Sequence, residues 1–313
     1  EIHNRPSYLK YFQYFKNKIV FYFHNDPLSM AGSISVEDRY FILNKCHKII
    51  FNSEWTKKRF FIGINNFYLN SEKIEVIYQS TSKKKININK KEKIVTFVGK
   101  LNKSKGYDLF GKAILKILNE FKDWRAFVFG DELREKIIFN HKRLSHMGYK
   151  SNDEVLKIFE KSSLAVVCSR WNEPFGRSSL EASSRGCAVI ISNKGGLPET
   201  ITDGIILNKL TVNEIYKNIK NLIVNKKKLK DIQKKSYKYF YLDNKFISKK
   251  IDNYRSRFFN KIIENKKKLR ILHITNFNVR HNGRLFYNTG RRINNGLQKL
   301  GHTVQTLSDR DTV

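Results

Sequence analysis

Short apolar runs alternate along the chain with longer segments in which apolar residues recur every three or four positions. Runs of this length favour buried strands, and the longer spacing favours helices that pack on them. Such alternation is typical of βαβ units built around a largely parallel sheet. The pattern predicts strands at 18–24, 48–53, 74–79, 94–99, 125–130, 164–169, 188–192 and 204–208.

Two Rossmann-like, doubly wound α/β domains follow from this pattern. The stretch 81–93 is polar and basic without apolar periodicity, which predicts a linker. We therefore expect one domain at 1–80 and a second at 94–242. The lysine-rich helical pattern at 243–268 predicts a crossing helix and a connection. The first residues read as the end of a strand, so the first domain is expected to be incomplete.

The C-terminal stretch 269–313 opens another strand–helix–strand pattern, with strands at 269–275 and 302–308 and a helix near 288–300. An unpaired sheet edge is an open template for a further strand. We expect Ile271 to Ile274 to pair in parallel with the sheet of the first domain.

The charge is strongly unbalanced, with 61 Lys and Arg against 28 Asp and Glu, a formal net charge of +33. Such an excess favours polyanions: nucleic acid, an anionic membrane surface or phosphate-bearing ligands. A solvated lysine surface is the alternative, because the lysine runs fall between apolar segments. A nucleic-acid-binding protein is therefore one candidate class, although no helix-turn-helix, RNP or zinc-finger pattern is present.

The three cysteines show no metal-binding spacing, and Cys168 and Cys187 sit in apolar runs. Inert core thiols are typical of a reducing compartment. No apolar run approaches the ~18 residues of a membrane span, and no signal peptide is visible. We expect a cytoplasmic location. The positive charge also fits peripheral association with the inner face of a membrane.

The residues that suggest chemistry follow the predicted strands. "VGKLNKSKG" leaves a strand at Gly99 and enters a helix near Gly106, which offers Lys100, Lys105 and helix-start amides to an anion. "NEPFGRSSLE" likewise leaves a strand and enters a helix, and Gly176 permits close approach of a ligand to the backbone. Ligands of open α/β sheets bind beyond the carboxyl ends of the strands, so both segments are candidate site loops.

Two carboxylates, Glu173 and Glu181, lie eight positions apart. Eight helical residues span about 12 Å, more than the roughly 5–9.5 Å between the carboxylates of a glycoside hydrolase. The two carboxylates therefore fit opposite ends of one extended ligand better than they fit the two sides of a single scissile bond.

Each of these residues also has a plain structural interpretation. Ser178 and Glu181 match an S-x-x-E capping box, so Glu181 could serve only its own helix. Glu173 before a proline could belong to a turn, the two lysines to the surface, and His24 to the core. Gly195 and Gly196 could form only a tight turn.

"EPFGRSSLEASSRGCAVIISNKGGLPE" closely resembles the E-x7-E signature of retaining family-4 glycosyltransferases (glycosyl transferases group 1), which have the GT-B fold of two Rossmann-like domains facing a cleft. "FVGKLNKSKG" resembles the phosphate-binding segment of that family. The likeness covers about residues 18 to 208. The resemblance makes 1–80 the acceptor-side domain and 94–242 the nucleotide-sugar donor-binding domain. The 269–313 stretch resembles the start of another acceptor-side domain, which would make the parent protein a tandem glycosyltransferase. Gly283 is then expected to replace the missing glycine loop of the first domain, opposite Lys105 and Glu173.

The resemblance implies transfer of a sugar from a nucleotide-diphosphate sugar, such as a UDP- or GDP-sugar, to an acceptor hydroxyl with retained configuration. It implies no metal and no cofactor, and a carbohydrate or lipid-linked acceptor in polysaccharide or cell-envelope biosynthesis. By the same resemblance, Glu173 and His24 are catalytic residues at the donor sugar, with His24 reaching it from the other domain. Glu181 is expected to hold the ribose hydroxyls.

The remaining donor-binding residues also come from the resemblance. Lys100 and Lys105 are expected to hold the diphosphate, with the amides of Phe175 and Gly176 beside it. Gly148 and Tyr149 are expected to border the base; these two lie in "MGYK". Lys100 departs from the arginine usual in the family, and a lysine gives a point charge instead of a bidentate fork. Because the first domain is expected to be incomplete, a non-catalytic nucleotide-sugar-binding module is an alternative.

Overall fold

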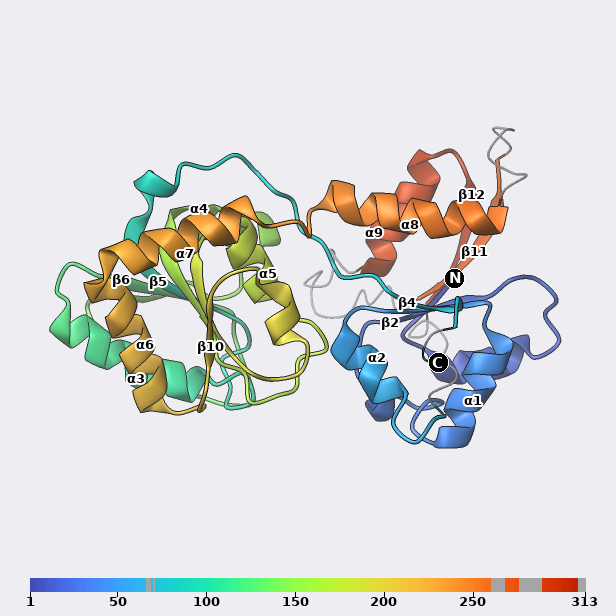
Figure 1. Ribbon diagram of the computed structural model, residues 1–313, viewed down its shortest axis with the longest axis horizontal. Helices are drawn as coiled ribbons and strands as arrows, with labels where there is room; N and C mark the ends of the chain where they lie inside the picture. The colour runs from blue at the N-terminus through green and yellow to red at the C-terminus, as the bar shows by residue number, and fades with distance from the viewer. Residues whose placement is uncertain (66–68, 70, 260–267, 276–288, 309–313) are drawn as a thin grey trace. The chain divides into compact units, whose positions relative to one another are not determined.

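The computed structural model describes residues 1–65, 69, 71–259, 268–275 and 289–308 and contains two compact units (Figure 1). The first unit comprises Glu1–Ile77 and Lys249–Val313, and the second comprises Tyr78–Ser248. Each unit has its own parallel sheet with helices packed on it. The expected α/β class with two Rossmann-like units is confirmed.

The first unit is built on a six-stranded sheet in which all neighbouring strands are parallel. Its order is β12 (Thr303–Ser308), β11 (Arg270–Thr275), β1 (Ile2–His3), β2 (Val20–Phe23), β3 (Lys48–Phe51) and β4 (Ile74–Val76). The predicted pairing of residues 271–274 with this sheet is confirmed, because Ile274 pairs with Ile2. Gly283 lies outside the described residues.

One face of this sheet carries the apolar core of the first unit. Phe21, Phe23 and Phe51 are fully buried there against helices α1 (Val36–Lys45) and α2 (Glu54–Phe60). Ser35 and Ser53 begin these helices, and each side chain accepts a hydrogen bond from a backbone amide of the first turn. Helices α8 (Asn244–Phe259) and α9 (Thr289–Lys299) lie on the other side of the sheet (Figure 1).

The second unit also has a six-stranded parallel sheet. Its order is β10 (Ile205–Leu207), β9 (Ala188–Ser192), β8 (Ser162–Val167), β5 (Glu92–Val98), β6 (Arg125–Phe129) and β7 (Leu144–His146). Its helices are α3 (Tyr107–Glu120), α4 (Asn152–Lys161), α5 (Arg177–Ser184), α6 (Val212–Val224) and α7 (Lys226–Lys238). After β5 the chain adds β6 and β7 on one side of β5, and it then crosses over to place β8 on the other side. The topological switch point, where such sheets bind ligands, therefore lies between β5 and β8.

The predicted linker 81–93 needs correction. Strand β5 begins inside it at Glu92, because Glu92 pairs with Ser162 in the sheet and its carboxylate forms an ion pair with Arg125 at 2.7 Å. The boundary between the units falls at Ile77 and Tyr78, so the remainder of this stretch belongs to the second unit. Strand β7 was not predicted, because its sequence, Leu-Ser-His, contains a single apolar residue and forms no apolar run. Short 3₁₀ helices occupy Pro6–Phe12, Pro27–Ser29, Ile88–Lys90 and Leu197–Thr200.

Cys46, Cys168 and Cys187 are all buried free thiols. Burial raises the pKa of Cys46 and of Cys168 to about 12, so neither is a thiolate at neutral pH. The prediction of inert core cysteines at 168 and 187 is confirmed. Within the described ranges, none of the helices combines the length and the apolar character that crossing a bilayer requires.

Candidate functional site

The loop after β5 and the loop after β8 are joined at the switch point of the second unit. The carbonyl of Ser104 accepts hydrogen bonds from the amides of Arg170 and Trp171, at 2.8 and 3.1 Å. Gly106 has a φ of +73°, and a Cβ there would overlap the carbonyl oxygen of Cys168. Only glycine fits this approach, so the contact holds the start of α3 against the end of β8.

This junction brings Lys105 and Glu173 together as an ion pair between Nζ and Oε1. The Lys105 side chain is 32% exposed and that of Glu173 only 14%. The amide of Lys105 donates to Oδ1 of Asn102 at 3.0 Å, which orients its loop. The ammonium of Lys105 thus has a carboxylate partner on the loop after β8.

The Gly195-Gly196 turn holds the backbone of Glu173. The amide of Gly196 donates to the carbonyl of Glu173 at 2.7 Å, and the two loops form an isolated parallel bridge between Glu173 and Gly195. Gly195 has a φ of +61°, and a Cβ there would collide with the Glu173 backbone. The glycine pair is a tight turn, and it also positions the site carboxylate.

Glu181 lies on α5 and is 5% exposed. Helix α5 begins at Arg177 with Gly176 as its N-cap, so Ser178 is not the capping residue. The capping-box interpretation is therefore wrong. Oε1 of Glu181 accepts a hydrogen bond from Nδ2 of Asn152 at 2.9 Å and forms an ion pair with Arg177 at 2.7 Å.

Two helices begin at the site with glycine N-caps, Gly106 before α3 and Gly176 before α5. Gly176 has a φ of +119°, and a Cβ there would overlap the side chain of Leu197. A glycine N-cap leaves the first amides of a helix without a side-chain acceptor, and the helix dipole adds positive potential there. Both starts are thus suited to an anion. Phe175 is buried and stacks on Tyr78 at 5.6 Å.

Glycines also join the loops after β5, β6 and β7. The amide of Gly130 donates to the carbonyl of Gly148 at 2.9 Å, and a Cβ at Gly130 would overlap the carbonyl oxygen of Gly99. Nothing lies within 4 Å of the Cβ position of Gly148. Tyr149 is 49% exposed, and Lys100 is exposed on the loop after β5. The candidate base-binding residues thus border open space at this end of the sheet.

His24 directly follows β2 in the first unit. Its amide donates to Oδ1 of Asn4 at 2.8 Å, and its carbonyl accepts from Nδ2 of Asn52 at 2.9 Å. Its Nε2 lies 3.0 Å from Nδ1 of His3. Burial lowers the pKa of His24 to about 4, so the ring is neutral at physiological pH.

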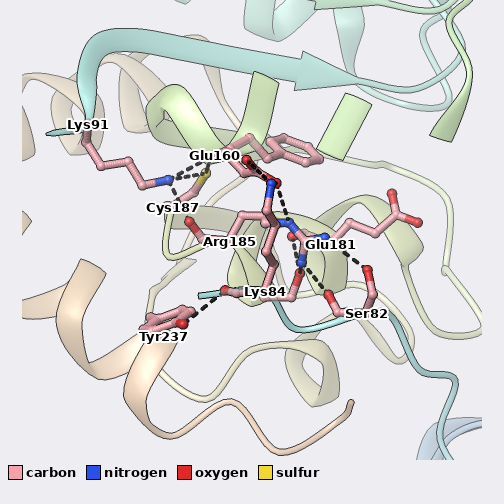
Figure 2. Close-up of polar contacts among 10 residues, drawn as sticks. Ser82, Lys84, Lys91, Glu160, Glu181, Arg185, Cys187 and Tyr237 are labelled. Carbon is pink, nitrogen blue, oxygen red and sulfur yellow. Dashed lines mark hydrogen bonds and ion pairs between the residues drawn. The ribbon is translucent and has the colours of Figure 1, made fainter. Parts of the chain in front are cut away.

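Polar contacts around the buried side chain of Arg185 hold the end of α5 (Figure 2). Arg185, at the end of α5, donates to the carbonyl and, at 2.9 Å, to the hydroxyl of Ser82. Its Nε lies 3.5 Å from the carboxylate of Glu160 on α4. Lys91 donates to the carbonyls of Phe159 and Arg185, both at 2.6 Å. These contacts fasten α4, α5 and the segment before β5 together.

Sequence reasoning missed three supporting residues of the site: Asn152, Arg177 and Arg185. Arg177 could have been found, because it stands four positions before Glu181 and such helical pairs attract each other. Asn152 and Arg185 carry no comparable signal, since each acts on another element of the fold.

Comparison with known proteins places the chain in a family. Residues 79–239, just over half of the chain, match the family described as Glycosyl transferases group 1. An uncharacterized 41.2 kDa protein in the cps region of Klebsiella pneumoniae is 33% identical over 152 residues, which are 44% of this chain and 41% of that protein. Spore coat protein SA of Bacillus subtilis is 33% identical over 129 residues, 36% of this chain and 33% of that protein. The chain thus spans well under half of the length of these relatives.

Solved structures show the same fold at low identity. A glycosyltransferase from Rickettsia africae has a TM-score of 0.64 and 17% identity, covering 83% of this chain and 76% of its own. HepE of Anabaena, solved with UDP-glucose, has a TM-score of 0.61 and 18% identity, covering 77% of this chain and 73% of its own. The chain belongs to the group 1 glycosyl transferases, and its two parallel α/β units have the fold of GT-B glycosyltransferases.

Proposed function

We propose that this chain binds a nucleotide-diphosphate sugar through its second unit and transfers the sugar to an acceptor hydroxyl with retention of configuration. The observation that carries the proposal is the Lys105–Glu173 pair, set between the glycine-capped starts of α3 and α5. Membership of the glycosyl transferase family supports the reaction class.

The chemistry of the departing diphosphate accounts for the positive groups. As the glycosidic bond to the diphosphate breaks, negative charge grows on the leaving oxygens and positive character on the sugar. Lys105, Lys100 and the amides beside Gly176 would stabilise that charge more in the transition state than in the bound donor, which is the condition for acceleration. Glu173 would orient the donor sugar through its hydroxyls without attacking it.

Glu181 is proposed to bind the ribose of the donor. The hydrogen bonds to Asn152 and Arg177 both fall on Oε1, and a buried carboxylate held in this way keeps a fixed orientation. The proposal assigns Oε2 to the ribose hydroxyls, with Gly148 and Tyr149 bordering the base. HepE of Anabaena is solved with UDP-glucose, which supports a UDP-sugar as the first donor to test.

The acceptor is proposed to be a carbohydrate or lipid-linked component of the cell envelope. Relatives include proteins of the Klebsiella cps region and a lipopolysaccharide core mannosyltransferase of Rhizobium leguminosarum. The net charge of +33 and the exposed lysines of α7 further support peripheral contact with an anionic membrane surface. On this proposal the enzyme works at the cytoplasmic face.

A donor-binding and transfer assay tests the proposal. A thermal-shift panel of UDP- and GDP-sugars should give stabilisation by one nucleotide class, since a ligand that binds only the folded state raises the Tm. Transfer to a membrane-extract acceptor, with the product anomer assigned by NMR, tests retention. Binding without transfer would favour the non-catalytic module, and binding to random DNA without a response to any nucleotide sugar would contradict the proposal.

A further inference from the structure

A second histidine, His3, lies against His24 in the sheet of the first unit. Nδ1 of His3 is 3.0 Å from Nε2 of His24. The planes of the two rings are nearly parallel, with an angle of 4° between them, and the ring centroids are 5.3 Å apart. They come from neighbouring strands, because His3 ends β1 and His24 follows β2, although 21 residues separate them along the chain.

The position of His3 is set by stacking as well as by the hydrogen bond. Across the β1–β2 ladder His3 pairs with Tyr22, and their rings stack with centroids 4.3 Å apart and an angle of 6° between the ring planes. The ring of His273 on β11 meets His3 edge-on at 6.4 Å. His3 is 7% exposed. It therefore has little freedom to turn away from His24.

The hydrogen bond constrains where the protons lie. Burial lowers the pKa of both histidines, so both rings are neutral at physiological pH. A neutral imidazole carries one N–H and one bare nitrogen. For two neutral rings to bond through Nδ1 of His3 and Nε2 of His24, one of these nitrogens must carry the proton and the other must not. The proton state of each ring then determines that of its partner.

The outer nitrogen of each ring is left available. Among the described residues, Nδ1 of His24 and Nε2 of His3 are buried and have no hydrogen-bond partner. A buried polar atom without a partner costs free energy and is an uncommon feature of a folded protein. For His24 that atom is Nδ1, because Nε2 is already engaged by His3.

We infer that His3 is a positioning residue for His24: its hydrogen bond holds the His24 ring in one orientation and one tautomer, and Nδ1 is then the ring nitrogen that has no protein partner among the described residues. The inference rests on the proposed glycosyltransferase function and on the catalytic role that the family resemblance implies for His24, and it adds a residue that acts through His24. It parallels the way in which a second group fixes the tautomer of a catalytic histidine through its other ring nitrogen.

The test uses the full chain labelled with ¹⁵N-histidine, with His24 signals assigned from a His24→Asn variant. At pH 7 the unaltered protein should show two distinct His24 ring-nitrogen signals, one protonated and one not, as a single neutral tautomer requires. His3→Phe keeps a stacked ring but cannot hydrogen-bond, so the two signals should converge toward a tautomer average. His3→Asn can place an amide atom where Nδ1 lies and should keep them distinct.

Donor transfer gives the second readout. His3→Phe should lower kcat about three- to tenfold with little change in donor KM, as expected for loss of one hydrogen bond. His3→Asn should recover most of the activity. Tyr22→Phe is the matched control, because it changes the neighbouring stacked ring without removing the His3–His24 bond; its His24 signals should match those of the unaltered protein.

The outcomes separate the inference from the proposed function. An averaged His24 tautomer in the unaltered protein, or His24 signals unchanged in His3→Phe, would overturn the role of His3 alone. A His24→Ala variant that transfers sugar normally would overturn the roles of both histidines and leave the donor site of the second unit to be judged by its own variants. If His3→Phe fails to fold, the tautomer of the unaltered protein and the behaviour of His3→Asn still decide the question.

Discussion

The ammonium of Lys105 is paired with the carboxylate of Glu173, although 68 residues separate them in the chain. One follows β5 and the other follows β8, the two strands at the switch point of the second sheet. A donor phosphate would compete with Glu173 for this lysine, and a donor hydroxyl would compete with the lysine for Glu173. On the proposed function, a donor that carries both groups would replace the contacts within this pair.

Replacing Lys105 with alanine should impair transfer more than folding. A charge-assisted hydrogen bond is worth about 1.5–3 kcal/mol, so kcat/KM should fall roughly ten- to a hundredfold. Steady-state kinetics with a saturating acceptor would measure this. Lys103→Ala is the matched control, because it removes the same charge from an exposed position of the same loop. Equal kinetics for the two variants would contradict the assignment of Lys105.

Glu173 and Glu181 should be separable by their kinetics. Glu181→Gln keeps an oxygen for Asn152 but loses the charge that pairs with Arg177 and binds ribose, so donor KM should rise. Glu173→Gln should mainly lower kcat, because Glu173 is proposed to meet the reacting sugar. Donor titration and turnover measured on the same preparations decide this. If Glu181→Gln binds the donor normally, Glu181 serves only to join α4 and α5.

Gly195→Ala should disable the site through the backbone. Alanine at a φ of +61° is strained, and its Cβ would collide with the backbone of Glu173. Such strain costs of order 1–3 kcal/mol, so the Tm should fall and transfer should be lost. Gly296→Ala on α9 is the control, because open space surrounds its Cβ position; in a helix this change should stabilise by about 0.4–1 kcal/mol. A Gly195→Ala protein with normal Tm and activity would refute the role of the turn.

Stability should fall as the pH drops from about 6.5 toward 4, the window set by the lowered pKa of His24. The unfolded chain takes up a proton near the ordinary histidine pKa of about 6.5, whereas buried His24 resists protonation until the pH nears 4. Each such group costs at most about 1.4 kcal/mol per pH unit in this window. Urea unfolding at pH 7 and pH 5 measures the loss in the free energy of unfolding. His24→Gln should make this loss smaller, and an equal loss in that variant would show that His24 does not cause it.

The basic surface should give salt-sensitive binding to anionic membranes. Each Lys near such a surface contributes about 1 kcal/mol, and exposed lysines of α7 are Lys226, Lys227, Lys228, Lys234, Lys235 and Lys238. Sedimentation with vesicles containing anionic lipid should recover the protein at low salt and release it at high salt. Changing three of these lysines to glutamine should weaken binding without affecting the Tm. Equal sedimentation with neutral vesicles would rule out this interaction.

The sequence by itself determined the strands of both sheets and the loops that bear the site. The run "AVIIS" became β9 at Ala188–Ser192, because a strand buried on both faces needs a continuous apolar run, which is a local property. The E-x7-E segment and the "VGKLNKSKG" loop could be placed at carboxyl ends of strands for the same reason. Strand β7, with the sequence Leu-Ser-His, contains one apolar residue and left no such pattern.

Only the tertiary structure decided which side chains meet. The Lys105–Glu173 pair depends on β5 and β8 being neighbours, and the His3–His24 bond depends on the pairing of β1 with β2. Local spacing even misled at Glu181, where an S-x-x-E pattern suggested a cap. The close approach of Gly176 to Leu197 instead starts α5 at Arg177, and Glu181 bonds to Asn152 on α4. Strand order and helix packing are set by the burial of the whole core, so contacts between distant segments leave no local signal in the chain.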